Sequence, residues 1–264
     1  MYAANITRID IAYATGKVSR QAADPTEADW TAAKRILRYL REKENFCLRY
    51  ARQEKLQLEV FCDADFAGDA DSAKSTTGFV ILLGGSPIHW KSKRETSVAK
   101  SSTEAELISL NHAVEDTMWI KKLALELQII NEEPVPVYCD NQSTVRIVTD
   151  EKSMHRTRHM KVKAGYVREK IEQGEVTVTH VKADEQLADM LTKPMTGKKF
   201  MRDRNLLMSM LSFMVMIASI LSIANCMTFD QVTPIVWTKL RNYASPGLNM
   251  YNVMIKFINP CQVI

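Results

Sequence analysis

The hydrophobic pattern between residues 53 and 195 changes its period several times, and the order of these changes restricts the fold more than any other feature. Apolar residues at every second position indicate a strand at 56–63, and apolar runs at 78–83 and 88–93 are joined by a Gly-Gly-Ser-Pro hairpin connection. Further helices and strands alternate over 101–128, 135–140, from about 141, 176–181 and from about 184. The order β β β α β α β α predicts an α/β fold that opens with three antiparallel strands.

Two segments flank this region. Before residue 53, Thr26 is placed to cap a helix with an apolar stripe and several basic residues, either a solvated amphipathic helix or a basic face beside nucleic acid. Toward the C-terminus, residues 205–229 carry no charge, and about 20 apolar residues suffice to cross a bilayer. This run could be a transmembrane anchor, an internal signal sequence with a secreted fragment beyond it, or translated read-through without a selected role.

The overall composition excludes several classes of protein. With 264 residues, 46% of them hydrophobic and 25% charged, the chain has enough apolar material for one sizeable core, which argues against a disordered or fibrous protein. The five cysteines are scattered without a CxxC pair, so they indicate neither a zinc site nor a disulfide framework. The net charge of +4 favours an anionic partner without identifying one.

Four carboxylates fall where the expected strands and helices meet. Asp63 ends the first strand and Glu106 lies in the first turn of the long helix, while Asp140 ends the fourth strand and Asp189 lies in the last helix. Strand ends and adjoining helix starts can converge on one edge of a mixed sheet. Converging carboxylates repel one another unless cations lie between them, and hard oxygen ligands suit Mg²⁺ or Mn²⁺. The pattern therefore predicts a cation site suited to two-metal phosphodiester hydrolysis.

Each of these carboxylates also has a purely structural interpretation, as a turn residue, a helix N-cap or a surface acid. The helix start is the clearest case, because Ser101 with Glu104 and Thr103 with Glu106 are competing capping boxes. A box closed by Glu104 would leave Glu106 free to face the sheet. Local patterns taken one at a time leave both interpretations open.

Six ordered motifs resemble the ribonuclease H domain of copia-type retrotransposon polyproteins. They are Cys62-Asp-Ala-Asp-Phe-Ala-Gly-Asp, Lys74-Ser-Thr-Thr-Gly-Phe, His89-Trp-Lys-Ser-Lys, Ser101-Ser-Thr-Glu-Ala-Glu-Leu, Tyr138-Cys-Asp-Asn-Gln and Gln186-Leu-Ala-Asp-Met-Leu-Thr-Lys-Pro. Two earlier runs, Thr7-Arg-Ile-Asp-Ile-Ala-Tyr-Ala and Trp30-Thr-Ala-Ala-Lys-Arg-Ile-Leu-Arg-Tyr-Leu, are similar to the end of the preceding reverse transcriptase. The resemblance covers about residues 1–198.

The resemblance implies a ribonuclease H-like fold, a five-stranded mixed sheet with flanking helices, preceded by a helical remnant and followed by a hydrophobic tail. It divides the chain into a reverse transcriptase remnant at 1–52, a ribonuclease H-like domain at 53–198, and residues 199–264 of unknown role. It implies cleavage of the RNA strand of an RNA/DNA hybrid by two Mg²⁺ ions, with Mn²⁺ as an alternative. The implied metal ligands are Asp63, Glu106, Asp140 and Asp189. Glu106 is preferred to Glu104 because the family's helix glutamate precedes a bulky apolar residue, here Leu107.

Basic residues near these carboxylates are expected to contact the phosphates of the hybrid, with solvated surface as the plain alternative. These residues are Lys91, Lys93, Arg94, Lys100, Arg156, Arg158 and His159. His180 ends the final strand, and we interpret it as structural rather than catalytic. No polymerase activity is expected, because the paired-aspartate motif would lie upstream of Met1, in a reverse transcriptase domain that would be a partner of this segment.

Two rival functions stay open from the sequence. A transposase or integrase of the same fold would usually place its glutamate last among the acidic ligands, whereas Glu106 comes second. A remnant of a decayed element could bind hybrids without cleaving them, or be tethered to a membrane through residues 205–229. The expected location is cytoplasmic, in the context of a virus-like particle.

Overall fold

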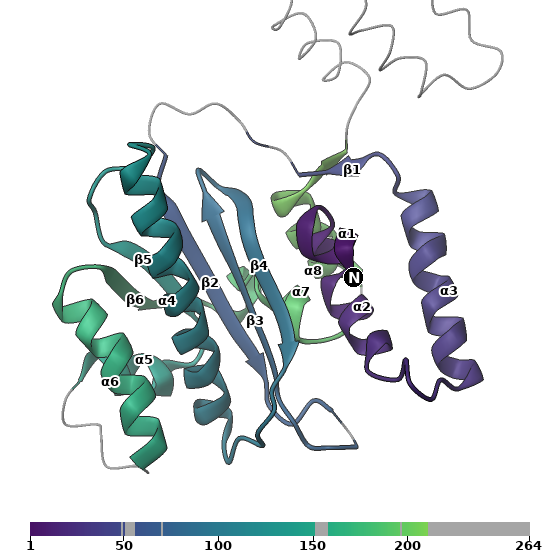
Figure 1. Ribbon diagram of the computed structural model, residues 1–264, viewed down its shortest axis with the longest axis horizontal. Coiled ribbons are helices and arrows are strands. Elements are labelled where there is room, and N and C mark those ends of the chain that lie inside the picture. Colours follow the sequence, from purple (N-terminus) through teal and green to yellow (C-terminus); the bar gives the residue numbers. More distant parts are fainter. Residues whose placement is uncertain (49, 51–55, 70, 151–157, 196, 211–264) are drawn as a thin grey trace, which may run out of the picture. The chain divides into compact units, whose positions relative to one another are not determined.

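A computed structural model describes residues 1–210 except 49, 51–55, 70, 151–157 and 196, and residues 211–264 lie outside the described part (Figure 1). Its centre is a five-stranded sheet in the order β4-β3-β2-β5-β6. The strands are β2 (Leu58–Asp65), β3 (Thr76–Leu83), β4 (Ser86–Arg94), β5 (Val135–Cys139) and β6 (Val176–His180). The first three pair in antiparallel fashion, and β5 and β6 run parallel to β2. The predicted mixed five-stranded sheet with flanking helices is confirmed.

Period-two alternation along the strands divides the sheet into two apolar faces. Val60 and Cys62 of β2 lie in one buried cluster, while Phe61, the residue between them, packs against a second cluster. Phe79 and Val80 of β3 are divided between the same two clusters. Because successive side chains point to opposite faces, β2 and β3 contribute to both layers of the core, whereas β5 and β6 contribute buried residues to the first cluster.

Helices cover both faces of the sheet (Figure 1). The first cluster lies under α4 (Ser102–Glu126), α5 (Gln142–Thr149) and α6 (Arg158–Glu172). The second face is covered by short elements from both ends of the described chain. They are α1 (Tyr2–Ile6), η1 (Ile9–Ile11), α2 (Ala12–Ser19), η3 (Ala183–Glu185), α7 (Asp189–Thr192) and α8 (Gly197–Leu207). The sheet therefore depends on the N-terminal and C-terminal segments to bury its second face.

The region after residue 183 differs from the single helix expected from about residue 184. A 3-10 turn precedes α7, which has four residues, and α8 follows. Pro194 stands directly after the C-cap residue Lys193, and proline disfavours helical backbone in the residue before it. Gly197 begins α8 with a φ of 70°, a value that glycine adopts readily. Two breaker residues thus divide the expected helix.

The segments on either side of the predicted boundaries share one core. Ile9 and Phe46 from the N-terminal segment, and Leu207 and Met208 from beyond residue 198, are buried in the same cluster as Trp90 of β4. The short strands β1 (Phe46–Cys47) and β7 (Ser209–Met210) also pair with each other. The assignment of 1–52, 53–198 and 199–264 to parts of a polyprotein stays a prediction, but residues 1–210 form one compact unit.

Helix α3 (Glu27–Glu42) begins as the sequence indicates. Thr26 caps it and forms a reciprocal capping box with Asp29, in which each residue's side chain bonds the other's backbone N–H. None of its residues is buried, as expected for a solvated helix, and the nucleic-acid interpretation of its basic face stays a prediction.

The predicted membrane segment falls mainly outside the described residues, and the part that can be followed differs from a membrane span. Residues 205–207 belong to α8, and Leu207 and Met208 are buried against the sheet. Among residues 1–210, no helix is long and apolar enough to cross a bilayer. Positions 211–229 are not described.

Candidate active site

The ends of neighbouring parallel strands bring two of the predicted carboxylates together. Cys62 of β2 is the register partner of Cys139 of β5, so the residues that follow them, Asp63 and Asp140, lie side by side. Helix α7 adds Asp189, and one carboxylate oxygen from each of the three aspartates lies within 4.8 Å of the others. Residues separated by more than a hundred positions therefore meet at one edge of the sheet.

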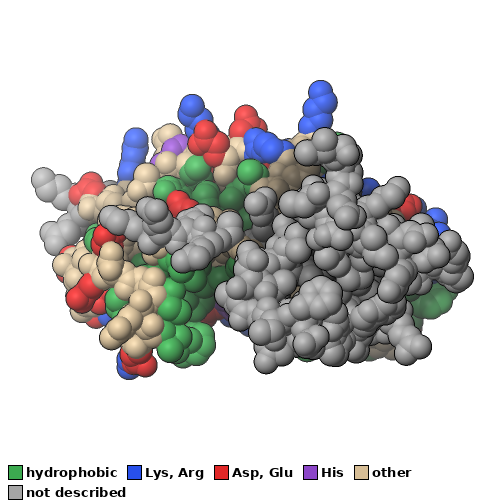
Figure 2. All heavy atoms as spheres, turned by 90° about the horizontal axis from the view of Figure 1, so that it is seen from above, with side chains coloured by type: hydrophobic (Ala, Val, Ile, Leu, Met, Phe, Trp, Pro, Cys, Tyr) green, Lys and Arg blue, Asp and Glu red, His purple; other side chains and the backbone are tan. Residues whose placement is uncertain are grey.

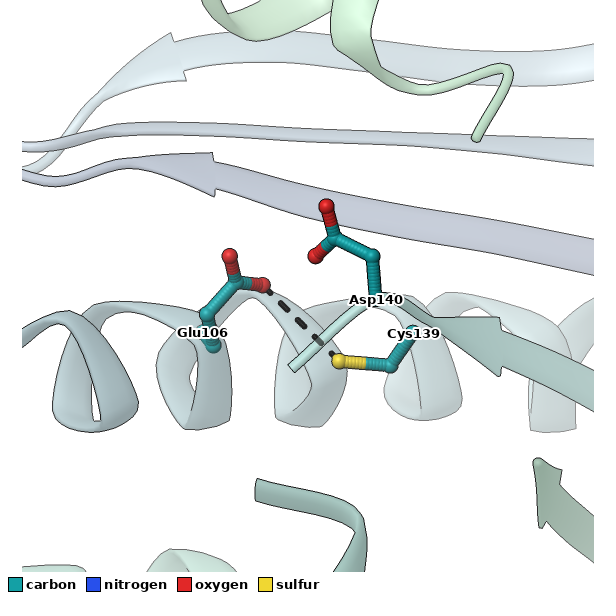
Figure 3. A group of neighbouring side chains, drawn as sticks. All are labelled: Glu106, Cys139 and Asp140. Atoms are coloured by element: carbon teal, nitrogen blue, oxygen red, sulfur yellow. Dashed lines mark hydrogen bonds between the residues drawn. The ribbon is translucent and has the colours of Figure 1, made fainter. Parts of the chain in front are cut away.

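Glu106 joins this group from α4. Ligand atoms of Glu106, Cys139 and Asp140 also lie within 4.8 Å of one another, and the Cys139 thiol donates a hydrogen bond to Glu106 Oε2 at 3.9 Å. Figure 3 shows Glu106 of α4 beside Asp140 and Cys139 at the end of β5. Asp140 belongs to both groups, so all four predicted carboxylates gather at one site. Their role as metal ligands stays a prediction.

The start of α4 separates the two glutamates, with Ser101 as the N-cap and the Glu104 side chain bonded to the backbone just before it. The Ser101 hydroxyl accepts a hydrogen bond from the Glu104 N–H at 3.2 Å, and Glu104 Oε2 accepts from the Lys100 N–H at 2.8 Å. Glu106 lies in the second turn of the helix, not in the first turn as expected, and its side chain faces the sheet. Because Glu104 satisfies the helix start, Glu106 is left for the site.

Asp140 is not the helix cap that a structural interpretation would make it. Asn141 caps α5, with its Oδ1 accepting a hydrogen bond from the Thr144 N–H at 3.0 Å. The Asp140 side chain therefore remains directed toward the other carboxylates (Figure 3).

A glycine allows α7 to approach the sheet. Gly78 is the register partner of Asp63, and a Cβ atom built on it would lie 2.5 Å from Thr192 Cγ2 and 2.8 Å from Leu191 Cβ. Two hydrogen bonds fix α7 in this place, since Gln186 Nε2 donates to the Cys62 carbonyl at 2.9 Å and Ser92 Oγ donates to the Leu191 carbonyl. A strand glycine thus makes room for the helix that carries Asp189.

The carboxylates also meet three side chains that the sequence analysis did not single out. The Thr192 hydroxyl donates a hydrogen bond to Asp63 Oδ2. Lys193 Nζ lies 2.7 Å from Asp189 Oδ1 and 3.6 Å from Asp63 Oδ2, and Lys199 Nζ contacts Asp189 Oδ2. Thr192 and Lys193 follow Asp189 within its own motif, and this proximity in sequence to a predicted metal ligand is the signal that could have found them.

Burial and mutual repulsion disfavour ionised carboxylates at this site. Burial raises the pKa of Asp63 to about 6, although Lys193 partly offsets the effect. Burial, and then the charge of Asp63, raises the pKa of Glu106 to about 11. The pKa of Asp140 is also raised, mainly by burial. Asp63 and Glu106 are only 2% and 6% exposed, so water screens their charges poorly. The site is therefore short of positive charge.

The donor set suits hard divalent cations. Asp63, Glu106, Asp140 and Asp189 supply carboxylate oxygens from four different elements, and such oxygens are typical ligands of Mg²⁺ and Mn²⁺. A cation among them would relieve the mutual repulsion of these carboxylates. Cys139 adds a thiol at the edge of the group, a softer ligand that is not typical of magnesium sites.

Of the residues predicted to contact nucleic acid, some form ion pairs within the protein and others are exposed. Lys91 forms an ion pair with Asp116 at 3.5 Å, and Arg94 binds Asp69 at 2.8 Å. Lys93 and Lys100 are exposed. Arg156 lies outside the described residues, and Arg158 and His159 begin α6 with side chains that are not described. On the face seen in Figure 2, basic side chains alternate with acidic ones, without a continuous basic patch among the described residues.

His180 lies at the edge of the site. It ends β6, is exposed, and its Nε2 lies 3.1 Å from the Asp140 carbonyl oxygen. The structural interpretation of His180 stays a prediction.

A second acidic residue close in sequence has a different environment. Asp69 is held by Arg94, by Arg20 Nη1 at 3.2 Å and by the Ser72 hydroxyl. The hydrogen bond from Ser72, followed by the contact with Arg94, lowers the pKa of Asp69 to about 2. This cluster ties α2, which ends just before Arg20, to the loop after β2 and to β4.

Comparison with known proteins adds relatives for most of the chain. No family model matches it. The retrovirus-related Pol polyprotein from transposon TNT 1-94 of Nicotiana tabacum is 39% identical over 200 residues, which are 76% of this chain and 15% of that protein. The Pol polyprotein from transposon RE2 of Arabidopsis thaliana is 36% identical over 194 residues, which are 74% of this chain and 13% of that protein. The chain thus spans less than a sixth of either relative.

Solved structures include a crystal structure of LC11-RNase H1 in complex with RNA/DNA hybrid. It is 17% identical to this chain, with a TM-score of 0.39, and the match covers 52% of this chain and 94% of that one. The sequence relatives carry the family assignment, and they agree with the resemblance of the six motifs. This chain belongs to the retrovirus-related Pol polyproteins of copia-type transposons.

Proposed function

We propose that this chain hydrolyses the RNA strand of RNA/DNA hybrids as an endonuclease, within a retrotransposon Pol polyprotein. One observation carries the proposal, namely that four carboxylates predicted from separate motifs converge at one edge of the sheet. Membership of the Pol family supports the substrate class. The raised pKa values of Asp63 and Glu106 add support, because strongly perturbed titratable groups cluster at functional sites.

Asp63, Glu106, Asp140 and Asp189 would hold two divalent ions, Mg²⁺ or Mn²⁺. When bound, such ions activate water and stabilise the departing oxygen of a phosphodiester. The protein's own part is to hold the four carboxylates in place. Gln186 and Ser92 fix α7 against the sheet, and the Asn141 cap and the Glu104 box keep two further carboxylates free.

Contacts to the hybrid would come from exposed cations near the site. Lys93 and Lys100 are the exposed members of the predicted set whose side chains are described, and phosphate contacts of this kind make affinity depend on salt. Preference for RNA would rest on the 2′-hydroxyl groups that an A-like duplex displays in its minor groove. We also propose that an upstream reverse transcriptase domain is a partner of this segment. Its location would be the cytoplasm, in a virus-like particle.

The test is cleavage of a labelled RNA/DNA hybrid by the full chain in Mg²⁺. The wild type is compared with Asp140→Asn and with Asp184→Asn, which removes an exposed carboxylate five residues before Asp189. We expect cleavage by the wild type and by Asp184→Asn, and a loss of at least about 100-fold in Asp140→Asn, the scale found when one charge-stabilising group is removed.

Two outcomes would contradict the proposal. Cleavage that persists in Asp140→Asn would indicate a contaminating nuclease or another site. No cleavage by the wild type would favour the alternative function, a remnant that binds hybrids without cutting them. Binding of the hybrid, measured in the same samples by fluorescence anisotropy, would then identify that remnant.

A further inference from the structure

Lys193 is the one described residue whose ammonium group reaches two of the four carboxylates. Its Nζ lies 2.7 Å from Asp189 Oδ1 and 3.6 Å from Asp63 Oδ2. The two carboxylates are almost completely buried, whereas the Lys193 side chain is 40% exposed. The ammonium therefore pairs with two buried carboxylates at the end of a side chain that solvent still reaches.

We propose that Lys193 is a built-in counter-cation of this site and that it gives up its place between Asp63 and Asp189 when a divalent cation binds. The inference rests on the proposed function, because it assumes that the carboxylates bind divalent ions. It assigns Lys193 a positioning role, in which it holds the carboxylates together before the ions arrive and limits how tightly these ions are held.

Lys193 and a divalent ion compete for the same carboxylate oxygen. At an ordinary hydrogen-bond distance the ammonium uses the same Asp189 oxygen that a divalent ion would need. Two cations within a few ångströms repel strongly in a buried setting, where water screens charge poorly. Occupation by Lys193 and by a divalent ion at this position therefore exclude each other. Without any cation, Asp63, Asp140 and Asp189 would repel one another.

Lys193 has room to move its side chain. The residue follows α7 in extended backbone, with φ −136° and ψ 157°, and its backbone N–H is anchored to the Asp189 carbonyl at 3.2 Å, so the movement is confined to the side chain. It also lines a cavity of about 480 Å³ between α2, α3 and the residues after α7. A lysine stem has four rotatable carbons, so the ammonium can leave the carboxylates without moving the backbone.

Lys199 provides an internal contrast. Its Nζ contacts Asp189 Oδ2 and also donates hydrogen bonds to the carbonyl oxygens of Ala183, at 2.6 Å, and Gln186, at 3.5 Å. These backbone acceptors tie Lys199 to the 183–189 loop. Lys199 is therefore a fixed structural tie, whereas the ion pairs of Lys193 with Asp63 and Asp189 are free to exchange for a divalent ion.

The experiment measures Mn²⁺ binding by the full chain, using calorimetric titration and the thermal midpoint with and without Mn²⁺. The variants are Lys193→Met, which keeps the apolar stem and removes the charge, and Lys199→Met as the matched control at the same aspartate. Lys93→Met controls for the loss of one exposed positive charge.

We expect Lys193→Met to bind Mn²⁺ at least about tenfold more tightly than the wild type, a change of about 1.4 kcal/mol. Its thermal midpoint should fall without Mn²⁺ and recover more than the wild type's when Mn²⁺ is added. Lys93→Met should show neither change. Lys199→Met, which removes a structural tie, should lower the thermal midpoint equally with and without Mn²⁺ and leave the Mn²⁺ affinity unchanged. If Lys193→Met does not fold without Mn²⁺, Lys193→Gln replaces it, because glutamine keeps a hydrogen-bond donor.

The outcomes separate the two proposals. Unchanged or weaker Mn²⁺ binding by Lys193→Met, or an equal gain in Lys199→Met, would overturn the role of Lys193 while leaving the proposed function intact. Absence of Mn²⁺ binding in all four proteins would contradict the proposed function itself. If Lys193 had a merely structural role, Lys193→Met would lower the thermal midpoint equally with and without Mn²⁺ and would leave the Mn²⁺ affinity unchanged.

Discussion

Asp63 and Asp69 stand six residues apart and show opposite ways of placing a carboxylate in a protein. Asp69 is surrounded by Arg20, Arg94 and Ser72, and its pKa falls to about 2. Asp63 lies among other carboxylates, and burial raises its pKa to about 6. The two residues belong to the same sequence motif. Ser72 reaches Asp69 from three residues along the chain, whereas Arg20 and Arg94 are brought to it by the fold.

The comparison separates structural from functional charge. At Asp69 the protein supplies its own cations, and the ion pairs hold α2, the loop after β2 and β4 together. At Asp63 the positive charge is insufficient, even with Lys193 nearby. A buried carboxylate group that lacks charge compensation costs stability, which proteins tolerate mainly where the charge has a function.

The largest expected effect is a difference in hybrid cleavage between variants of Asp63 and of Asp69. Asp63→Asn should lower hybrid cleavage by at least about 100-fold, because it removes a proposed metal ligand. Asp69→Asn, measured below its melting temperature, should stay within about threefold of the wild type, because Asp69 lies outside the carboxylate group. Cleavage assays on the full chain in Mg²⁺ decide the matter. Equal losses in both variants would show that the two aspartates do not differ in function.

The second expected effect is on the free energy of unfolding, which should depend on Asp69. Asp69→Asn should lower the free energy of unfolding by about 3 kcal/mol, since it leaves Arg20 and Arg94 without their buried partner. Asp71→Asn, at an exposed position two residues later, serves as the control and should change it by less than about 0.5 kcal/mol. Urea unfolding measures both. A loss below about 1 kcal/mol for Asp69→Asn would mean that the ion cluster contributes little.

A third change would displace α7, the helix that brings Asp189 to the carboxylates around Asp63. Gly78→Ala should cost about 2 kcal/mol, because the new Cβ would overlap Thr192 and Leu191 and push α7 from the sheet. Cleavage should fall as well, since α7 carries Asp189. Gly165→Ala is the matched control, because a Cβ at this position in α6 meets nothing within 4 Å, and it should be neutral or stabilising. If Gly78→Ala were as stable and active as the wild type, the close approach of α7 would be irrelevant.

The smallest effect is on the pH dependence of stability, to which Asp69 and Asp63 should contribute with opposite signs. The lowered pKa of Asp69 contributes stability above its ordinary value of 3.8, which is lost as pH falls toward 2. The raised pKa of Asp63 acts the other way, so its contribution is complete below 3.8 and is lost as pH rises toward 6. Without divalent ions, the thermal midpoint should therefore rise from pH 2 to 4 and fall from pH 4 to 6.

Calorimetry in a chelating buffer tests the direction of each limb of this pH dependence. Asp63→Asn should flatten the upper limb and Asp69→Asn the lower limb. A midpoint that keeps rising from pH 4 to 6 would contradict the assigned direction of the Asp63 shift.

Much of the fold could be predicted because it depends on neighbours in sequence. Alternating side chains marked β2, and the residues around Thr26 and Ser101 marked two helix starts. The path after residue 183 was harder to predict, because Pro194 and Gly197 interrupt a pattern that otherwise suggests one helix. The placement of Leu207 and Met208 also escaped prediction, since an apolar run has the same composition in a core as in a membrane.

The sequence by itself determined the order of strands and helices as far as β6 and the identity of the four carboxylates. Which residues cap α4 and α5, and so leave Glu106 and Asp140 free, was left open by the local patterns. Only the tertiary structure decided that Gly78 admits α7, that Arg20 and Arg94 neutralise Asp69, and that Lys193 reaches Asp63. The physical reason is range. Hydrogen bonds within a helix turn and alternation along a strand act over a few residues, whereas charge compensation and close packing depend on distances in space between residues far apart in the chain.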